Sequence, residues 1–163
     1  MEFKIRNEEA KEIEQVREIL KAAFPTEAES KLVDALRANG KASISLVAER
    51  SGQVLGHILF SPVTTTPPSA VPPNVQAQGI GSQLIREGLC LCQELEDVYC
   101  FALGNPKYYQ RFGFARASKC DLQNEYGVDD EFMVIRFSNQ GMSEKEMAHG
   151  LVRYAPEFAL FSV

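Results

Sequence analysis

The chain has 163 residues, 45% of them hydrophobic and 24% charged, which is the size and composition of one globular domain with its own core. Its net charge of −5 and the lack of a basic footprint argue against a nucleic-acid-binding protein. Apolar runs such as 58–60 are far shorter than the roughly 20 residues of a membrane helix, and no secretory leader pattern opens the sequence. We therefore expect a cytoplasmic protein that binds neither nucleic acid nor membrane.

The first forty residues carry a helical pattern. Apolar residues recur every three or four positions over 8–23 and 27–38, which predicts two amphipathic helices. Asn7 is placed to cap the first helix, and Asn39 with Gly40 is a typical end for the second.

The pattern then changes to strands. Residues 43–48 alternate as a strand, 51–52 is a Ser-Gly turn and 54–63 is expected to be a second strand, so we predict an antiparallel hairpin. Four prolines within 64–75 remove four backbone donors, which excludes a long central strand there. At most a short strand around 69–71 remains.

The rest of the chain predicts alternating helices and strands. A helix is expected from 81 to about 95, with its apolar stripe at Leu84, Gly88, Leu91 and Leu95. It is followed by a buried strand at 98–103 and by a short helix that Asn105-Pro106 opens and that runs to 111. The last expected elements are a strand at 132–137, a helix at 144–149 and a strand at 158–161. This order indicates a single α/β domain over 1–163 with a mixed sheet.

The four cysteines favour neither a disulfide framework nor a metal site. Cys90 and Cys92 lie two apart in the expected helix, where their side chains point to different sides. Cys100 lies in an apolar run, and Cys120 is the fourth cysteine. We expect reduced, mostly buried thiols and no metal.

The segment 76–82, Gln-Ala-Gln-Gly-Ile-Gly-Ser, opens directly into a predicted helix. Glycines allow a tight turn and a close approach, and the start of a helix offers unpaired N–H groups and a positive dipole end. Such a turn is typical of a phosphate site, although a purely structural turn has the same composition. The third glycine of a dinucleotide fold and the Gly-Lys-Ser/Thr of a P-loop are both missing.

A second motif spans 104–114, where Tyr108 and Tyr109 stand between Lys107 and Arg111. A phenol near a cation can donate a proton to a leaving group. The alternative is that both rings only pack in the core.

Taken together, the two motifs resemble the GCN5-related N-acetyltransferase (GNAT) superfamily over roughly residues 3–137. The similarity rests on Ser69-Ala70-Val71-x-Pro73-x-x-Gln76-x-x-Gly79-Ile80-Gly81 and on Tyr108-Tyr109-x-x-Phe112-Gly113-Phe114, with supporting matches at 46–49, 56–63 and 24–37. The resemblance implies a central mixed, largely antiparallel twisted sheet flanked by helices. In this chain the prolines shorten the central strand of that fold.

The resemblance also implies an enzyme that moves an acetyl group from acetyl-CoA to a primary amine. Tyr109 matches the tyrosine that protonates the departing CoA thiolate, and Tyr108 would line the tunnel. Asn105 is expected to touch the pantetheine arm. The other implied cofactor-binding residues are Ala70 and Val71 for the pantetheine arm, Gln76 within the motif, and the backbone amides of Ala77, Gln78, Gly79, Ile80, Gly81 and Ser82 for the pyrophosphate.

The general base, the acceptor and the oligomeric state are less defined. Glu29 matches the second-helix pattern and is the best acidic candidate for the base, whereas His57 is either a buried strand histidine or the base. The acceptor would be a small-molecule amine or a peptide amine, and a monomer and a homodimer both fit the sequence. Two further hypotheses stay open: a CoA or acyl-CoA-binding module without turnover, and a domain that keeps only the fold as an interaction partner.

Overall fold

The computed structural model describes residues 2–66, 73–77, 81–95, 99–137 and 150–160. It divides the chain into two compact units. The first unit comprises residues 1–61, 76–91 and 156–163, and the second comprises residues 62–75 and 92–155. The assignment of 1–163 to a single domain stays a prediction.

The first unit contains three antiparallel strands in the order β1-β2-β3. They are β1 (Lys4–Asn7), β2 (Ile44–Arg50) and β3 (Gln53–Pro62), whose last residue belongs to the second unit. The β2–β3 turn has Ser51 and Gly52 at φ 53° and 82°, the left-handed pair that a two-residue hairpin requires. This confirms the predicted hairpin.

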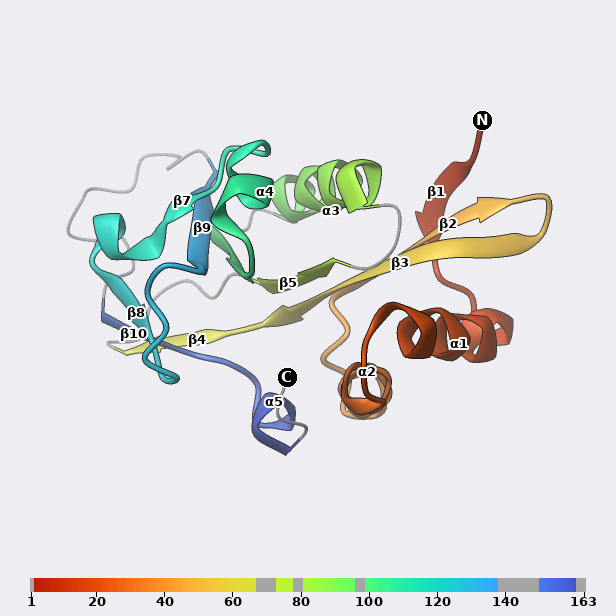
Figure 1. Cartoon of the computed structure of the whole chain (residues 1–163), viewed down its shortest axis with the longest axis horizontal. Helices are drawn as coiled ribbons and strands as arrows, with labels where there is room; N and C mark the ends of the chain where they lie inside the picture. The colour runs from red at the N-terminus through yellow and green to blue at the C-terminus, as the bar shows by residue number, and fades with distance from the viewer. Residues whose placement is uncertain (1, 67–72, 78–80, 96–98, 138–149, 161–163) are drawn as a thin grey trace. The chain divides into compact units, whose positions relative to one another are not determined.

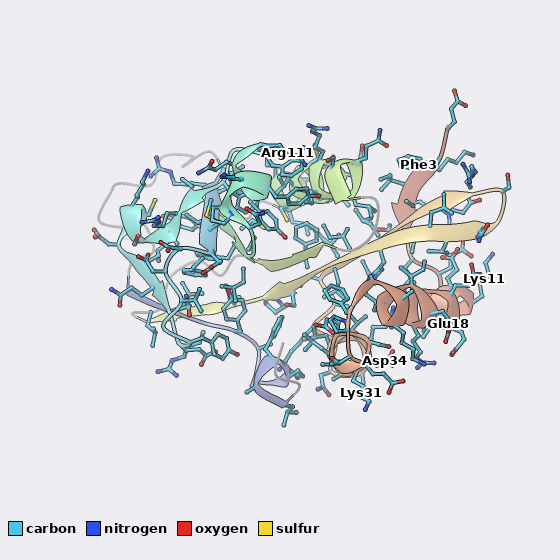
Figure 2. The ribbon with its side chains drawn as sticks, in the orientation of Figure 1. Phe3, Lys11, Glu18, Lys31, Asp34 and Arg111 are labelled. Carbon is cyan, nitrogen blue, oxygen red and sulfur yellow. The ribbon has the colours of Figure 1, made fainter. Side chains whose placement is uncertain are left out.

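Helices cover both faces of these strands (Figure 1). The helical elements are η1 (Ala10–Glu12), α1 (Ile13–Ala23), α2 (Ala28–Ala38), α3 (Gly81–Glu94) and α5 (Glu157–Leu160). The two N-terminal helices lie on one face and α3 lies on the other. Glu18 of α1 and Lys31 of α2 project on the side away from the strands (Figure 2). Both N-terminal helices are amphipathic, as their periodicity predicts, and therefore bury one stripe each.

The core of the first unit is built on both faces of β2 and β3. On one face Val16 of α1 and Leu36 of α2 are completely buried. On the other face Phe60 of β3 lies against Gly88 of α3, where an added Cβ would be 2.3 Å from the phenyl ring. The missing side chain at Gly88 therefore lets α3 approach β3 closely.

The second unit holds strands that belong to two sheets. In the first, β5 (Pro73–Ala77) is parallel to β6 (Tyr99–Leu103), and β9 (Phe132–Arg136) is antiparallel both to β6 and to β7 (Ala115–Arg116). In the second sheet, β10 (Gly150–Arg153) lies between β4 (Thr64–Thr66) and β8 (Leu122–Asn124). The remaining elements are α4 (Pro106–Gln110) and η2 (Ala117–Cys120). The predicted buried strand, short helix and following strand are thus confirmed as β6, α4 and β9.

Two predictions about the ends of the chain are wrong. Asn7 does not cap the first helix, because it is the last residue of β1; instead the backbone N–H of Glu9 donates to the Glu12 carboxylate at 2.8 Å. The expected last strand at 158–161 is the helix α5 over its described residues. Glu157 of α5 is buried and accepts hydrogen bonds from Lys41 and from Asn39, both at 2.8 Å. These contacts stabilise the helical turn of α5.

The stripe predicted for α3 is correct only at its first half. Leu84 and Gly88 are buried, but Leu95 is 60% exposed. Ile85 and Cys92 are completely buried instead, because the buried face of α3 is broader than the stripe assumed. The cysteines point to different sides as expected, although only Cys92 and Cys100 are buried while Cys90 and Cys120 are exposed.

The proline-rich segment has strands that were not predicted. Its described parts form β4 before residue 67 and β5 after residue 72, with Pro73 as the first residue of a strand, a position that tolerates proline. The predicted strand at 69–71 and the predicted helix at 144–149 lie outside the described residues.

Candidate active site

The turn into α3 belongs to the first unit, and the structure describes both of its flanks. Gln76 and Ala77 end β5, and Gly81 and Ser82 begin α3, where the predicted helix starts. The first turn of α3 has no acidic residue, so its N-terminal N–H groups face no competing carboxylate from the helix itself. Residues 70–71 and 78–80, which include Ala70, Val71, Gln78, Gly79 and Ile80, lie outside the described residues. The phosphate role of this turn stays a prediction.

Asn105 caps α4 in the second unit. Its side-chain oxygen accepts a hydrogen bond from the Lys107 backbone N–H at 3.0 Å, and Pro106 occupies the first helical position. Its backbone carbonyl accepts from Tyr108 and Tyr109 at 3.1 and 3.2 Å. The cap uses the oxygen of the side-chain amide, and among the described residues no partner is seen for its NH2 group.

Tyr109 is the buried member of the tyrosine pair. Its side chain is 7% exposed, and its ring makes edge contacts with Tyr108 and Phe114 at centroid distances of 5.3 and 5.4 Å. Burial raises the pKa of Tyr109 to about 12, with smaller contributions from Tyr108 and Cys100. The phenol is therefore protonated throughout the physiological range, which suits a proton donor and not a general base.

Tyr108 lies on a different side of α4. Its ring is half-buried, contacts Phe112 edge-on at 5.3 Å and carries the Arg111 guanidinium 4.8 Å above its face. Arg111 follows α4 at the surface (Figure 2). The two adjacent tyrosines thus have separate environments, as expected for neighbours on one helix.

Glu29 lies on the buried stripe of α2, at helical spacing from Leu32, Val33 and Leu36. The carboxylate oxygen Oε2 has no contact with solvent and no hydrogen-bond partner among the described residues. A carboxylate oxygen in this state costs free energy unless a ligand pairs with it. Glu29, which the sequence pattern suggested as the base, therefore has an oxygen atom that accepts no hydrogen bond from the described residues.

His57 belongs to a buried polar network in the first unit that the sequence did not predict. Its Nε2 lies 2.8 Å from Ser45 Oγ, and that hydroxyl donates to a Glu8 carboxylate oxygen at 2.7 Å. The same carboxylate accepts from Arg37 Nε at 3.2 Å. Because Ser45 has one hydrogen and gives it to Glu8, His57 must donate from Nε2, which leaves Nδ1 as a buried acceptor without a partner among the described residues.

This environment decides between the two interpretations of His57. Burial and the positive charge of Arg37 lower the pKa of His57 to about 3. A general base near neutral pH needs a pKa close to the working pH, and His57 is far below it. The buried strand histidine is therefore the interpretation that fits.

The candidate residues fall into two groups. Glu29 and the start of α3 belong to the first unit, and the second unit brings Tyr108 and Tyr109 together on α4, next to its N-cap Asn105. Within the described ranges, no group of three or more His, Cys, Asp or Glu side chains could hold a metal ion. No described helix combines the length and apolarity needed to cross a membrane.

Comparisons with known proteins give consistent findings. The family model of the acetyltransferase (GNAT) domain matches residues 41–116. The uncharacterized N-acetyltransferase YhbS of Escherichia coli K12 is 34% identical over 154 residues, which cover 88% of this chain and 90% of that protein.

Two solved structures are also similar. The crystal structure of Escherichia coli YhbS in complex with CoA is 29% identical, with a TM-score of 0.87, and the match covers 96% of this chain and 92% of that one. A GNAT family acetyltransferase from Brucella melitensis in complex with acetyl-CoA is 31% identical, with a TM-score of 0.77 and coverage of 96% and 98%.

Proposed function

Because this chain is an N-acetyltransferase of the GNAT family, we propose that it transfers an acetyl group from acetyl-CoA to a primary amine. The observation that carries the proposal is the ligand of the two similar structures, which is CoA in one and acetyl-CoA in the other. The acceptor class rests on the family and on the net charge of −5, which favours the approach of a cationic amine.

The binding half of the proposal concerns backbone groups. Unpaired N–H groups at the start of a long helix, with the positive end of its dipole, are suited to a pyrophosphate. The amides of 77–82 would hold the pyrophosphate, and the backbone of Ala70 and Val71 would pair with the pantetheine arm. The absence of an acidic side chain from the first turn of α3 supports this assignment. The NH2 group of Asn105 would donate to the same arm.

The chemical half of the proposal is direct attack. The amine nitrogen attacks the thioester carbonyl carbon, the C–N bond forms, and the C–S bond breaks with its electron pair left on sulfur. The nitrogen loses one proton and the CoA sulfur gains one, so the products are the acetylated amine and CoA thiol. Holding the two reactants in line supplies up to roughly 7–11 kcal/mol of the barrier when the geometry is ideal.

Tyr109 would act on the leaving sulfur. A thiol has a pKa near 8.5, so complete proton transfer from a phenol with a pKa of about 12 is uphill by about 5 kcal/mol. The neutral phenol can instead donate a hydrogen bond that strengthens as charge develops on sulfur, which is a form of transition-state stabilisation. The proton that finally neutralises the thiolate would pass through the Tyr109 hydroxyl, which regains one from solvent, while the proton of the attacking nitrogen goes to Glu29.

Glu29 would receive the acceptor. Its unpartnered oxygen Oε2 is a ready acceptor for the N–H of an amine or ammonium group. In this role Glu29 orients the amine and takes its first proton. The same oxygen distinguishes Glu29 from an ordinary helix-surface glutamate, whose carboxylate is fully solvated.

A second candidate function is a CoA or acyl-CoA-binding module without turnover. The observation that favours it is the proline-rich segment, whose described strands β4 and β5 have only three and five residues. A shortened central strand would remove backbone groups from the acceptor side while leaving the turn into α3 intact.

The test combines calorimetry with product analysis. Acetyl-CoA is titrated into the protein, and CoA formation is then followed by chromatography with a panel of polyamines, lysine derivatives and peptide N-termini. Chromatography is required because Cys90 and Cys120 are exposed free thiols that would react with a colorimetric thiol reagent. Amine-dependent CoA release supports the transferase, and binding heat without turnover supports the binding module. No heat and no thermal shift at millimolar acetyl-CoA would refute both.

A further inference from the structure

Gly104 lies between the end of β6 and the cap of α4, and it directly faces the ring of Tyr109. A Cβ built on Gly104 would lie 2.6 Å from Tyr109 Cε2, 3.4 Å from Cδ2 and 3.6 Å from Cζ. The shortest of these distances is well inside van der Waals contact, so any side chain at this position would collide with the phenol ring. The reason for glycine here is steric, because Gly104 is not among the glycines with positive φ.

The backbone on both sides of this contact is fixed by hydrogen bonds. Gly104 N–H donates to the Glu131 carbonyl at 3.0 Å, which anchors the glycine to the chain just before β9. Tyr109 N–H donates to the Asn105 carbonyl at 3.2 Å, and the Tyr109 carbonyl accepts from Phe112 and Phe114 at 3.0 and 3.3 Å. The collision therefore cannot be relieved by a simple shift of either backbone.

Two aromatic rings also flank the Tyr109 ring. Tyr108 contacts it edge-on at 5.3 Å and 82°, and Phe114 does so at 5.4 Å and 70°. With the ring almost completely buried, the bare backbone of Gly104 sets how far the ring, and hence its hydroxyl, enters the core.

We propose that Gly104 is a positioning residue for Tyr109, whose missing side chain fixes the location of the phenol hydroxyl against the leaving sulfur. The inference rests on the proposed role of Tyr109 as the donor in acetyl transfer. A displacement of about 1 Å in a catalytic group can cost about 10²-fold in rate. Gly104→Ala is thus expected to lower kcat by roughly 10- to 100-fold and to change the KM for acetyl-CoA little.

The first measurement follows the ring itself. The chain has five tyrosines, so the protein labelled with fluorotyrosine gives five NMR signals, and the one missing from Tyr109→Phe is that of Tyr109. In the wild type this signal should resist broadening by a soluble gadolinium chelate, because the side chain is buried. In Gly104→Ala the ring moves outward and the signal should broaden.

Gly88→Ala is the matched control. An added Cβ at Gly88 would lie 2.3 Å from the Phe60 ring, so this variant imposes a comparable collision in the first unit. It should lower the melting temperature and leave the Tyr109 signal protected. Exposure of Tyr109 in both variants would mean that the effect is general loosening, which would overturn the inference.

The second measurement is a double-mutant cycle with the wild type, Gly104→Ala, Tyr109→Phe and the combined variant. If Gly104 acts through the hydroxyl, Gly104→Ala should lose 10- to 100-fold in kcat in the wild-type background and less than about 3-fold in the Tyr109→Phe background. Equal losses in both backgrounds would overturn the inference. A fully active Tyr109→Phe protein would instead refute the proposed role of Tyr109.

Should Gly104→Ala fail to fold, the combination Gly104→Ala with Phe114→Leu relieves the crowding around the ring. The same cycle is then measured against Phe114→Leu alone. A Tyr109 signal that stays protected in the combined variant, with unchanged kcat, would contradict the positioning role.

Discussion

The Tyr109→Phe substitution removes one oxygen and keeps the ring. The ring's contacts with Tyr108 and Phe114 do not involve the hydroxyl, so we expect the free energy of unfolding to change by less than about 1 kcal/mol. Binding of acetyl-CoA should also change little. Loss of a general acid typically costs 10²- to 10⁴-fold, and we expect at least 10²-fold here, or about 2.7 kcal/mol of transition-state stabilisation.

The loss should appear in kcat and in kcat/KM alike, because the interaction is made only in the transition state. The assay is CoA formation by chromatography at saturating amine. Tyr108→Phe is the matched control: its ring is half-buried under Arg111 at the surface, and we expect less than about a 3-fold change.

The pH dependence gives an independent check. The donor must be protonated, so its contribution is present below its pKa and is lost as pH rises through it. Because burial raises the pKa of Tyr109 to about 12, kcat should show no decline from this group between pH 8 and 10. An ordinary phenol would already be half ionised near pH 10.

Two results would refute this reasoning. Wild-type activity in Tyr109→Phe would remove the donor role and leave water as the proton source. A crippled Tyr108→Phe beside an active Tyr109→Phe would show that the assignment on α4 is displaced by one residue.

Three further predictions concern the first unit. Gly81→Asp places a carboxylate at the start of α3 and should weaken acetyl-CoA binding at least 10-fold by calorimetry, with an unchanged circular dichroism spectrum. The hydrogen bond from Arg6 lowers the pKa of Glu12 from 4.5 to about 2, so Glu12 stabilises the fold above pH 4.5 and loses this effect as pH falls through 2. Glu12→Gln should therefore melt at a lower temperature than the wild type at pH 7, and this difference should shrink below pH 4.5. A difference that does not change with pH would contradict the pairing of Glu12 with Arg6. Ser45→Ala leaves the buried Nε2–H of His57 without its acceptor and should cost about 1–3 kcal/mol in urea unfolding, whereas an unchanged midpoint would argue against the network.

Elements with a strong local pattern were predictable from the sequence. The stripe of α2, the Ser-Gly turn between β2 and β3, and the Asn-Pro start of α4 all depend on residues close together in the chain. Strand β1 was missed because its four polar and apolar residues show little periodicity, and it forms by pairing with β2. The helix α5 was mistaken for a strand because the partner of Glu157, Lys41, lies more than a hundred residues away.

The candidate site divides in the same way. The start of α3 and the short helix that carries the tyrosine pair could be predicted because each is a short motif, and the roles of their residues stay predictions. The network of Glu8, Ser45 and His57 could not, since its members come from three separate segments and their pairing depends on the register of β2 and β3. The tautomer and the lowered pKa of His57 follow from that register and from Arg37, neither of which the sequence displays.

The tyrosine pair shows where local rules stop and packing takes over. Helix geometry already requires that Tyr108 and Tyr109 point to different sides, but it does not say which ring is buried. Phe114 and Gly104 decide this, because the first supplies a ring contact and the second leaves space where any other residue would collide. A glycine directly before a helix cap is usually explained by turn conformation, yet Gly104 does not have positive φ. The sequence shows a glycine five residues before Tyr109, but the φ of Gly104 and its contact with the ring come from the fold, so the sequence alone could not indicate which phenol lies inside.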